Sequence, residues 1–180
     1  MHIYSSGMKK TITVLALMLA CLAAGAQQYE GSFTQAKTLK VSGKVIKSAG
    51  TLSFKAPDQM VMLYTQPDGD YFIIDGPFLR MDMRGTALDV DTSTNKAIKI
   101  QRNALLYSIS GDYDKIAAEM EADINVSPKA GGKHVVIKVR NPQPRSYSAM
   151  ELDYGKDGRL TRMVLEEGSS ISTEYILNLK

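Results

Sequence analysis

The chain has 180 residues, of which 44% are hydrophobic and 23% are charged, so it can form one globular domain with a sizeable core. Its formal net charge of +3 falls to +1 without residues 1–26, because 20 basic and 19 acidic residues remain, and this balance excludes a typical nucleic-acid-binding protein. His134 is the one histidine beyond residue 26, which excludes a zinc site built from several histidines.

Residues 1–26 are predicted to be a cleavable signal peptide. The basic pair Lys9-Lys10 precedes an apolar run at 12–23, and Ala24-Gly25-Ala26 offers the small residues of a cleavage site. The apolar run is short for a transmembrane span. Met8 is a second candidate for the start of the protein, because it directly precedes the basic pair. We therefore expect an exported, periplasmic protein whose single mature domain covers 27–180.

Cys21, the only cysteine, lies inside this segment and leaves a second possibility open. Ala20 is the small residue that a lipidation site needs before its cysteine, whereas Met18 and Leu19 fit such a site poorly. The weaker alternative is therefore a lipoprotein anchored through Cys21. If cleavage follows Ala26, the mature chain has no cysteine and is stabilised by its core without disulfides.

The first half of the mature chain is predicted to form antiparallel hairpins. Apolar and polar residues alternate in short runs, as in strands with one buried face, and turn-forming residues separate the runs at 56–59 and 67–70. After a short lead-in at 27–32, the strands are expected at 33–41, 41–50, 52–55, 60–64, 71–74, 79–83 and 87–91. The runs at 60–64 and 71–74 are apolar on both faces.

A helical pattern follows, and then strands return. Residues 92–95 are rich in helix-capping types, and Ala97, Ile100, Ala104 and Tyr107 are spaced as the apolar stripe of a helix at 96–109 that ends at Gly111. Asp112 is positioned to cap a second helix at 113–122. Further strands are expected at 124–126, 134–140, 150–154, 160–166 and 171–177. The fold class is therefore α+β, with one antiparallel sheet of roughly nine to eleven strands and a helical insert.

The order of these segments resembles the LolA family of periplasmic outer-membrane lipoprotein carriers, in particular its Bacteroidetes-type members. The matching residues are Phe33-x-Gln35-x-Lys37, Ser48-x-Gly50-x-Leu52-x-Phe54, Pro57-Asp58-Gln59-Met60, Met62-x-Tyr64, Gln66-Pro67, Ile74-Asp75-Gly76, the helix ending at Gly111, and the final hairpin with Met163, Glu166 and Thr173. The resemblance spans essentially the whole mature chain. It implies an unclosed antiparallel β-barrel with a short helical lid.

The resemblance also implies a function. A carrier of this type binds the acyl chains of lipoproteins in a hydrophobic cavity, receives them from an inner-membrane ABC lipoprotein transporter, and delivers them to an outer-membrane acceptor or the membrane itself. It is not an enzyme, needs no cofactor, binds no nucleic acid and acts as a monomer. The acyl-chain cavity is then expected to be lined by Leu52, Phe54, Met60, Met62, Tyr64, Phe72, Ile74, Met81, Met83, Leu105, Ile109, Met150, Leu152, Met163 and Leu165.

Methionines are prominent among these residues. Of the seven in the mature chain, all but Met120 lie in predicted strands. Methionine is flexible and polarizable, and it recurs on surfaces that accept varied apolar partners, although it also fills ordinary cores. Both interpretations stay open on the sequence alone.

The chain departs from the family pattern at two places. The amphipathic helix that usually precedes the Phe-x-Gln strand is replaced by residues 27–32, and the strand arginine linked to lid closure in proteobacterial members is absent from 60–62. The alternatives are therefore a carrier or sensor of another lipid, such as a glycolipid or pigment lipid, or a non-enzymatic binding module of the cell envelope.

Other candidate sites have simpler explanations. No Gly-x-Ser-x-Gly elbow accompanies His134, so we expect a histidine at a strand end rather than a catalytic base. Asp68 and Asp70 belong to a turn and lack the spaced ligands of a calcium loop. The basic residues Lys138, Arg140, Arg145, Arg159 and Arg162 are expected on a solvated face, with a patch for lipid head groups or a partner as the alternative.

Overall fold

The structure is a computed structural model, and it describes residues 27–180. These residues form eleven strands, two α-helices and one short 3-10 helix. The elements are β1 (Gln28–Leu39), β2 (Lys44–Lys55), β3 (Gln59–Gln66), β4 (Asp68–Asp75), β5 (Phe78–Met83), β6 (Thr86–Asp91), η2 (Thr92–Thr94), α2 (Lys96–Ser110), α3 (Tyr113–Glu119), β7 (Ala122–Lys129), β8 (Gly132–Val139), β9 (Ala149–Gly155), β10 (Leu160–Glu167) and β11 (Ile171–Leu179).

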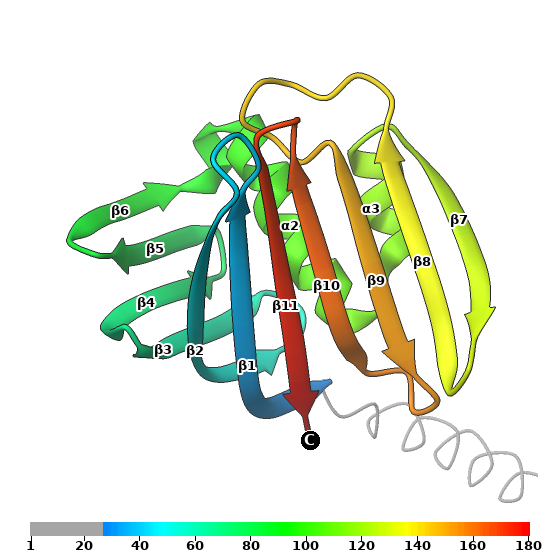
Figure 1. Ribbon diagram of the computed structural model, residues 1–180, viewed down its shortest axis with the longest axis horizontal. Coiled ribbons are helices and arrows are strands. Elements are labelled where there is room, and N and C mark those ends of the chain that lie inside the picture. The colour runs from blue at the N-terminus through cyan, green and yellow to red at the C-terminus, as the bar shows by residue number, and fades with distance from the viewer. Residues whose placement is uncertain (1–26) are drawn as a thin grey trace, which may run out of the picture.

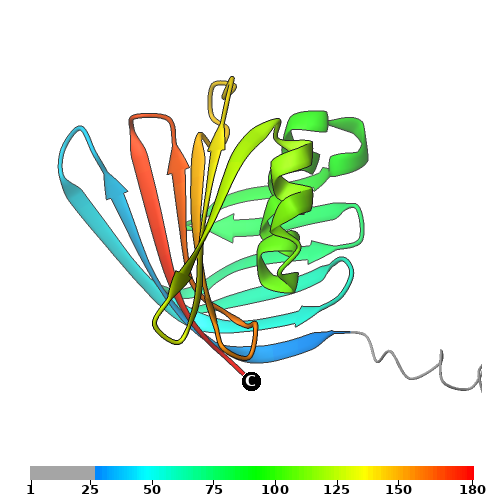
Figure 2. The same cartoon turned by 90° about the vertical axis from the view of Figure 1, so that its right-hand side faces the viewer.

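All eleven strands belong to one antiparallel sheet with the order β6-β5-β4-β3-β2-β1-β11-β10-β9-β8-β7. The sheet does not close, because β6 and β7 remain as its two edges. It curves around α2 and α3, which lie against its inner face (Figures 1 and 2). The predicted fold, an unclosed antiparallel barrel covered by short helices, is confirmed.

The N-terminal strands are longer than the alternation predicts. β1 begins at Gln28, so residues 28–32 are strand rather than lead-in, and β2 joins two predicted strands into one that pairs with β1 along its whole length. Gly50 makes this possible, because a Cβ at this position would lie only 2.1 Å from the backbone oxygen of Leu63 on β3. The glycine that resembled a turn signal instead permits close strand contact at a bulge.

The helices largely follow their predicted capping residues. The Asn95 side chain accepts a hydrogen bond from the Ile98 N–H at 3.1 Å and so caps α2, while Gly111 ends it in the left-handed conformation with a φ of 82°. Asp112 precedes α3 as expected but its side chain makes no capping bond; it instead accepts from Lys115 at 2.9 Å. α3 also ends at Glu119, three residues before the predicted end, because β7 begins at Ala122.

The core fills much of the space between the sheet and the helices. Phe33 packs edge-on against Tyr64 with ring centroids 5.0 Å apart, and Ile116 of α3 is fully buried. The Tyr154 hydroxyl on β9 donates to the Ser108 carbonyl at 2.9 Å and fixes α2 to the sheet. The helices are thereby held over the β8–β10 side of the inner face.

Two sequence predictions concern residues that precede 27–180. The signal peptide and the lipidation alternative at Cys21 fall within 1–26 and lie outside the described residues. Within 27–180, neither helix has the length and apolar character needed to cross a bilayer.

Candidate functional site

A cavity of about 470 Å³ lies between the inner face of the sheet and α2. This volume falls within the range of roughly 300–1,000 Å³ that small-molecule sites occupy. Strands β1 to β5 supply one part of its wall, β10 and β11 supply another, and Leu105 and Ile109 of α2 cover it. The cavity is therefore enclosed by both arms of the sheet and by one helix.

Strand alternation explains most of the wall. In a strand every second side chain points to the same face, so Met60, Met62 and Tyr64 of β3 all point inward while Leu63 is half exposed on the outer face. The run is apolar on both faces, but only its inner face is buried. The predicted residues that line the cavity are Leu52, Met60, Met62, Tyr64, Phe72, Met81, Met83, Leu105, Ile109, Met163 and Leu165.

Four predicted residues do not line the cavity. Phe54, Ile74, Met150 and Leu152 are at most 1% exposed and belong to the packed core. They share the inner face with the cavity residues, but neighbouring side chains already fill the space around them; Phe54, for example, stacks with Tyr29 at 6.1 Å. Burial of each contributes about 1.5–3 kcal/mol to stability, so their role in the structure is in the core.

A chain of uncharged polar groups crosses the middle of the wall. Gln35 Nε2 donates to the Tyr175 hydroxyl at 3.0 Å, and the Tyr64 phenol is close enough to Tyr175 for each to influence the other's pKa. Burial raises the pKa of Tyr64 to about 12, and burial followed by the neighbouring Tyr64 raises the pKa of Tyr175 well above its ordinary value. Both phenols therefore stay neutral near pH 7, and the wall offers hydrogen-bonding groups without a net charge.

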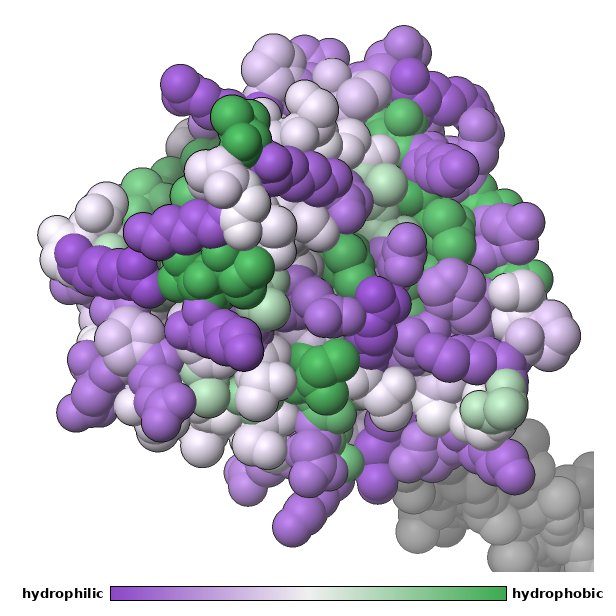
Figure 3. Space-filling view, viewed as in Figure 1, coloured by the Kyte–Doolittle hydropathy of each residue, from purple (hydrophilic) through white to green (hydrophobic). Residues whose placement is uncertain are grey.

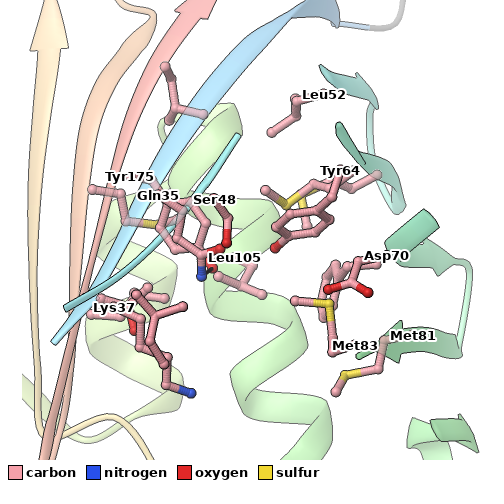
Figure 4. A pocket seen from close by; sticks show the side chains of 18 of the residues that line it. Gln35, Lys37, Ser48, Leu52, Tyr64, Asp70, Met81, Met83, Leu105 and Tyr175 are labelled. Atoms are coloured by element: carbon pink, nitrogen blue, oxygen red, sulfur yellow. Dashed lines mark hydrogen bonds between the residues drawn. The ribbon is translucent and has the colours of Figure 1, made fainter. Parts of the chain in front are cut away.

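Charged side chains also line the cavity, from more than one side. Lys37, Asp70, Arg84 and Glu167 all line it, two of each sign, and Asp70 Oδ1 accepts from the Arg84 backbone N–H at 2.8 Å. Figure 4 shows Lys37 and Leu52 at opposite ends, with Gln35 and Tyr175 between them. The cavity thus has an apolar end around Leu52 and a polar end around Lys37, an arrangement that suits an amphipathic ligand.

Sequence reasoning missed the polar part of the wall. Gln35 and Lys37 lie on the same face of β1 as Phe33, as strand alternation requires. No sequence pattern predicts that this part of the face lines a cavity. Alternation from Thr173 would also have found Tyr175 and Leu177. Tyr147 lies in the loop before β9, where no periodic pattern exists to place it.

His134 lies on the outer face of the sheet in a network of charges. Its Nδ1 is 2.6 Å from Asp153 Oδ1, while Lys129 Nζ donates to Asp153 Oδ2 at 2.7 Å. Burial on its own would raise the pKa of Asp153, but the hydrogen bonds from Lys129 and His134 outweigh it, so this pKa is lowered. The Ser127 hydroxyl donates to the backbone carbonyl of His134 at 3.5 Å and not to its ring, whose hydrogen bond is to Asp153.

Several of the basic residues considered from the sequence are paired. Arg162 Nε donates to Glu174 at 2.6 Å and its Nη1 to Glu151 at 3.3 Å, and Arg140 and Arg159 each contact an aspartate. The outer face is correspondingly hydrophilic, with hydrophobic side chains in separate patches (Figure 3). Within 27–180, no group of three or more His, Cys, Asp or Glu side chains is arranged to hold a metal ion.

Comparisons with known proteins agree with this architecture. The family model described as outer membrane lipoprotein carrier protein LolA matches residues 24–178. No curated protein matches the sequence at a significant level.

Solved structures with related shapes have low sequence identity. A LolA superfamily protein from Nitrosomonas europaea is 10% identical, with a TM-score of 0.43 over 86% of both chains. A putative outer membrane lipoprotein-sorting protein domain from Vibrio parahaemolyticus is 12% identical, with a TM-score of 0.43 over 93% of this chain and 90% of that one. The lipoprotein LppX of Mycobacterium tuberculosis is 14% identical, with a TM-score of 0.38 over 92% and 93%.

Proposed function

Because the chain belongs to the LolA family, we propose that it is a periplasmic carrier that binds the acyl chains of lipoproteins in the cavity and takes them from the inner to the outer membrane. The observation that carries this proposal is the cavity itself. It is about 470 Å³ in volume and is walled mainly by apolar side chains.

The composition of the wall supports an acyl ligand. Met60, Met62, Met81, Met83 and Met163 all contribute to it. Their flexible thioether side chains adapt to apolar partners of different shape. Burial of each methylene of an acyl chain is favourable by about 0.8 kcal/mol, so a long chain can be held without any ion pair. Binding through apolar packing is also consistent with the methionines at 60 and 62 of β3, where proteobacterial members of the family have an arginine.

The helix that covers the cavity supports loading and release. Leu105 and Ile109 line the cavity from α2, so any displacement of this helix removes part of the wall. The helix is held to the sheet by buried side chains such as Ala104 and Leu106 and by the hydrogen bond from the Tyr154 hydroxyl to the Ser108 carbonyl, so opening must break these contacts. We propose that α2 is the lid, and that ligand and lid compete for the same apolar surface.

The proposed partners follow from the family and from the predicted export of the chain. An inner-membrane ABC lipoprotein transporter would load the cavity, and an outer-membrane acceptor or the membrane would receive the acyl chains. The protein would act as a non-enzymatic monomer.

A second candidate function is a carrier or sensor of another lipid. The charged side chains of the wall favour it, because Lys37, Asp70, Arg84 and Glu167 offer hydrogen-bonding groups to a polar head group such as a sugar. A non-enzymatic envelope binding module without lipid cargo is the third possibility. The mass of the bound ligand separates these alternatives.

The test is to isolate the protein gently from cells and to identify what it retains by native mass spectrometry. We expect a lipoprotein or its acylated N-terminal fragment. Met81→Trp, which fills the cavity, should reduce the retained lipid severalfold, whereas Arg80→Trp on the exposed face of the same strand should not. A folded wild-type protein that retains no lipid and binds no lipid probe would contradict the proposal, and a retained glycolipid would favour the second candidate.

A further inference from the structure

The hairpin between β1 and β2 projects an apolar tip into solvent. Val41 is 92% exposed, the highest value among the large exposed hydrophobic residues, and Val45 is 48% exposed. A single exposed apolar side chain is ordinary on a protein surface. Here two of them lie within one hairpin, and in Figure 3 hydrophobic atoms stand among hydrophilic ones at the end of the molecule where this hairpin lies.

The turn holds this tip in a defined conformation. The Leu39 carbonyl accepts from the backbone N–H groups of Ser42 at 3.2 Å and Gly43 at 2.8 Å, and the Lys40 N–H donates to the Ser170 carbonyl at 2.8 Å. Gly43 has a φ of 68°, the left-handed conformation that glycine adopts without strain. The backbone of the turn is thus hydrogen-bonded, and Val41 is held outward on a supported loop.

Lysines surround the apolar tip. Lys37, Lys40, Lys44 and Lys47 lie within eleven consecutive residues. Lys40 pairs with Glu166, and no ion pair is formed by the other three within 27–180. The carboxylates on the adjoining β10–β11 hairpin are Glu166, Glu167 and Glu174, and Glu174 is paired with Arg162. The tip therefore combines exposed apolar side chains with an excess of positive charge.

The hairpin is also continuous with the cavity. Lys37, Leu39 and Ile46 line the cavity, and Lys37 is the register partner of Ile46. Val45 and Lys47 lie on the opposite face of β2 because successive side chains alternate. Any surface that the tip contacts is consequently brought next to the polar end of the cavity.

We infer that the β1–β2 hairpin docks the protein on the surface of an anionic lipid bilayer. Apolar side chains at the tip enter the interface, and the lysines interact with the anionic head groups. A convex, lysine-rich tip has no groove for a peptide, which favours a bilayer over a protein partner. The inference concerns where the protein docks, and it does not depend on which ligand the cavity holds.

Vesicle binding tests this inference. The processed protein isolated from cells is mixed with phosphatidylcholine vesicles that either contain or lack phosphatidylglycerol, and bound protein is measured by flotation at low and high salt. We expect binding only with phosphatidylglycerol and weaker binding at high salt. Lys44→Glu and Lys47→Glu should each weaken the apparent affinity about fivefold or more. Val41→Asp should weaken it and Val41→Phe should strengthen it.

Two matched variants control for nonspecific effects. Val126, on edge strand β7, is as exposed as Val45 at 48%, and Lys156 lies in the β9–β10 turn at the other end of the molecule (Figure 1). Val126→Asp and Lys156→Glu should leave binding unchanged. The inference is overturned if folded wild-type protein ignores anionic vesicles, if Val41→Asp and Val126→Asp behave alike, or if binding occurs only on native membranes and is lost when their proteins are digested.

Discussion

At Gly50, the absence of a side chain allows neighbouring strands to pack closely. A Cβ at Gly50 would lie 2.1 Å from the Leu63 backbone oxygen and 2.9 Å from Cε1 of Phe33. Neither the paired backbone nor the buried ring can move away cheaply. We expect Gly50→Ala to lower the free energy of unfolding by about 1–3 kcal/mol, measured by urea denaturation.

Gly155→Ala is the matched control for this substitution. A Cβ at Gly155 would meet the Asp157 Oδ1 at 2.9 Å, which belongs to a side chain that can rotate. We expect a clearly smaller loss of stability. Equal losses for the two variants would contradict the view that strand contact at Gly50 is the cause.

Residue patterns predict part of the cavity wall. Alternation assigned residues such as Met62 and Met81 to the inward face, and the resemblance to the family placed them in a cavity wall, which they line. Alternation cannot tell how far along a strand the space is filled, which is why Phe54 and Leu152 were expected in the cavity and lie in the core. That distinction depends on neighbours from other strands, such as Tyr29 against Phe54.

At the scale of elements, the two helices begin with chemically similar residues that act differently. Asn95 caps α2 through its side chain, whereas Asp112 makes no such bond to α3. Loss of a side-chain cap costs about 0.5–2 kcal/mol, so we expect Asn95→Ala to lower the free energy of unfolding by that amount. Asp112→Ala should change it by less than about 0.5 kcal/mol, because it removes an exposed contact to Lys115 and a long hydrogen bond of 3.3 Å from the Ser110 hydroxyl. Thermal and urea denaturation of both variants give the comparison; a larger effect at Asp112 would contradict it.

Element boundaries were predictable where one local interaction decides them. Asn95 and Gly111 fixed the ends of α2 through capping, which acts within a few residues. The extent of β2 was not predictable in this way, because its continuation through Gly50 depends on pairing with β1 and β3. The end of α3 likewise reflects the start of β7, an element that packs beside it.

At the scale of the whole molecule, the charge network on the outer face couples stability to pH. Lys129, His134, Asp153, Arg162 and Glu174 join strands β7 to β11. Because the pKa of Asp153 is lowered by folding, the unfolded chain binds this proton more readily. The stabilisation from Asp153 is therefore present above about pH 4 and is lost as the pH falls through its lowered folded-state value.

Asp153→Asn tests this coupling. We expect it to lower the free energy of unfolding at neutral pH by about 1–3 kcal/mol, since it removes the buried negative charge that Lys129 and His134 contact. The difference from wild type should shrink as the pH falls below about 4, in urea denaturation across that range. Asp157→Asn, in an exposed pair with Arg159, should have little effect at any pH. A difference at Asp153 that is independent of pH would contradict the assignment.

The overall topology was predictable only in part. Consecutive strands joined by short turns were expected to pair as hairpins, and the fold class followed from them. The pairing of β1 with β11 had no local signal, because it joins residues such as Phe33 and Leu177 that are far apart in the sequence. The cavity depends on that pairing, since it brings the walls formed by β1–β5 and β10–β11 together.

This central pairing also orders the assembly of the protein. In the described part of the chain, every pair of hydrogen-bonded strands except β1–β11 consists of strands that are neighbours in sequence. The sheet therefore consists of two meanders, β1–β6 and β7–β11, which are joined by the pairing of β1 with β11. Each meander can form through contacts between neighbouring strands. The β1–β11 pairing can form only when β11 is present, and non-local pairing of this kind is slow. A chain with this layout stays incompletely folded until its last strand arrives.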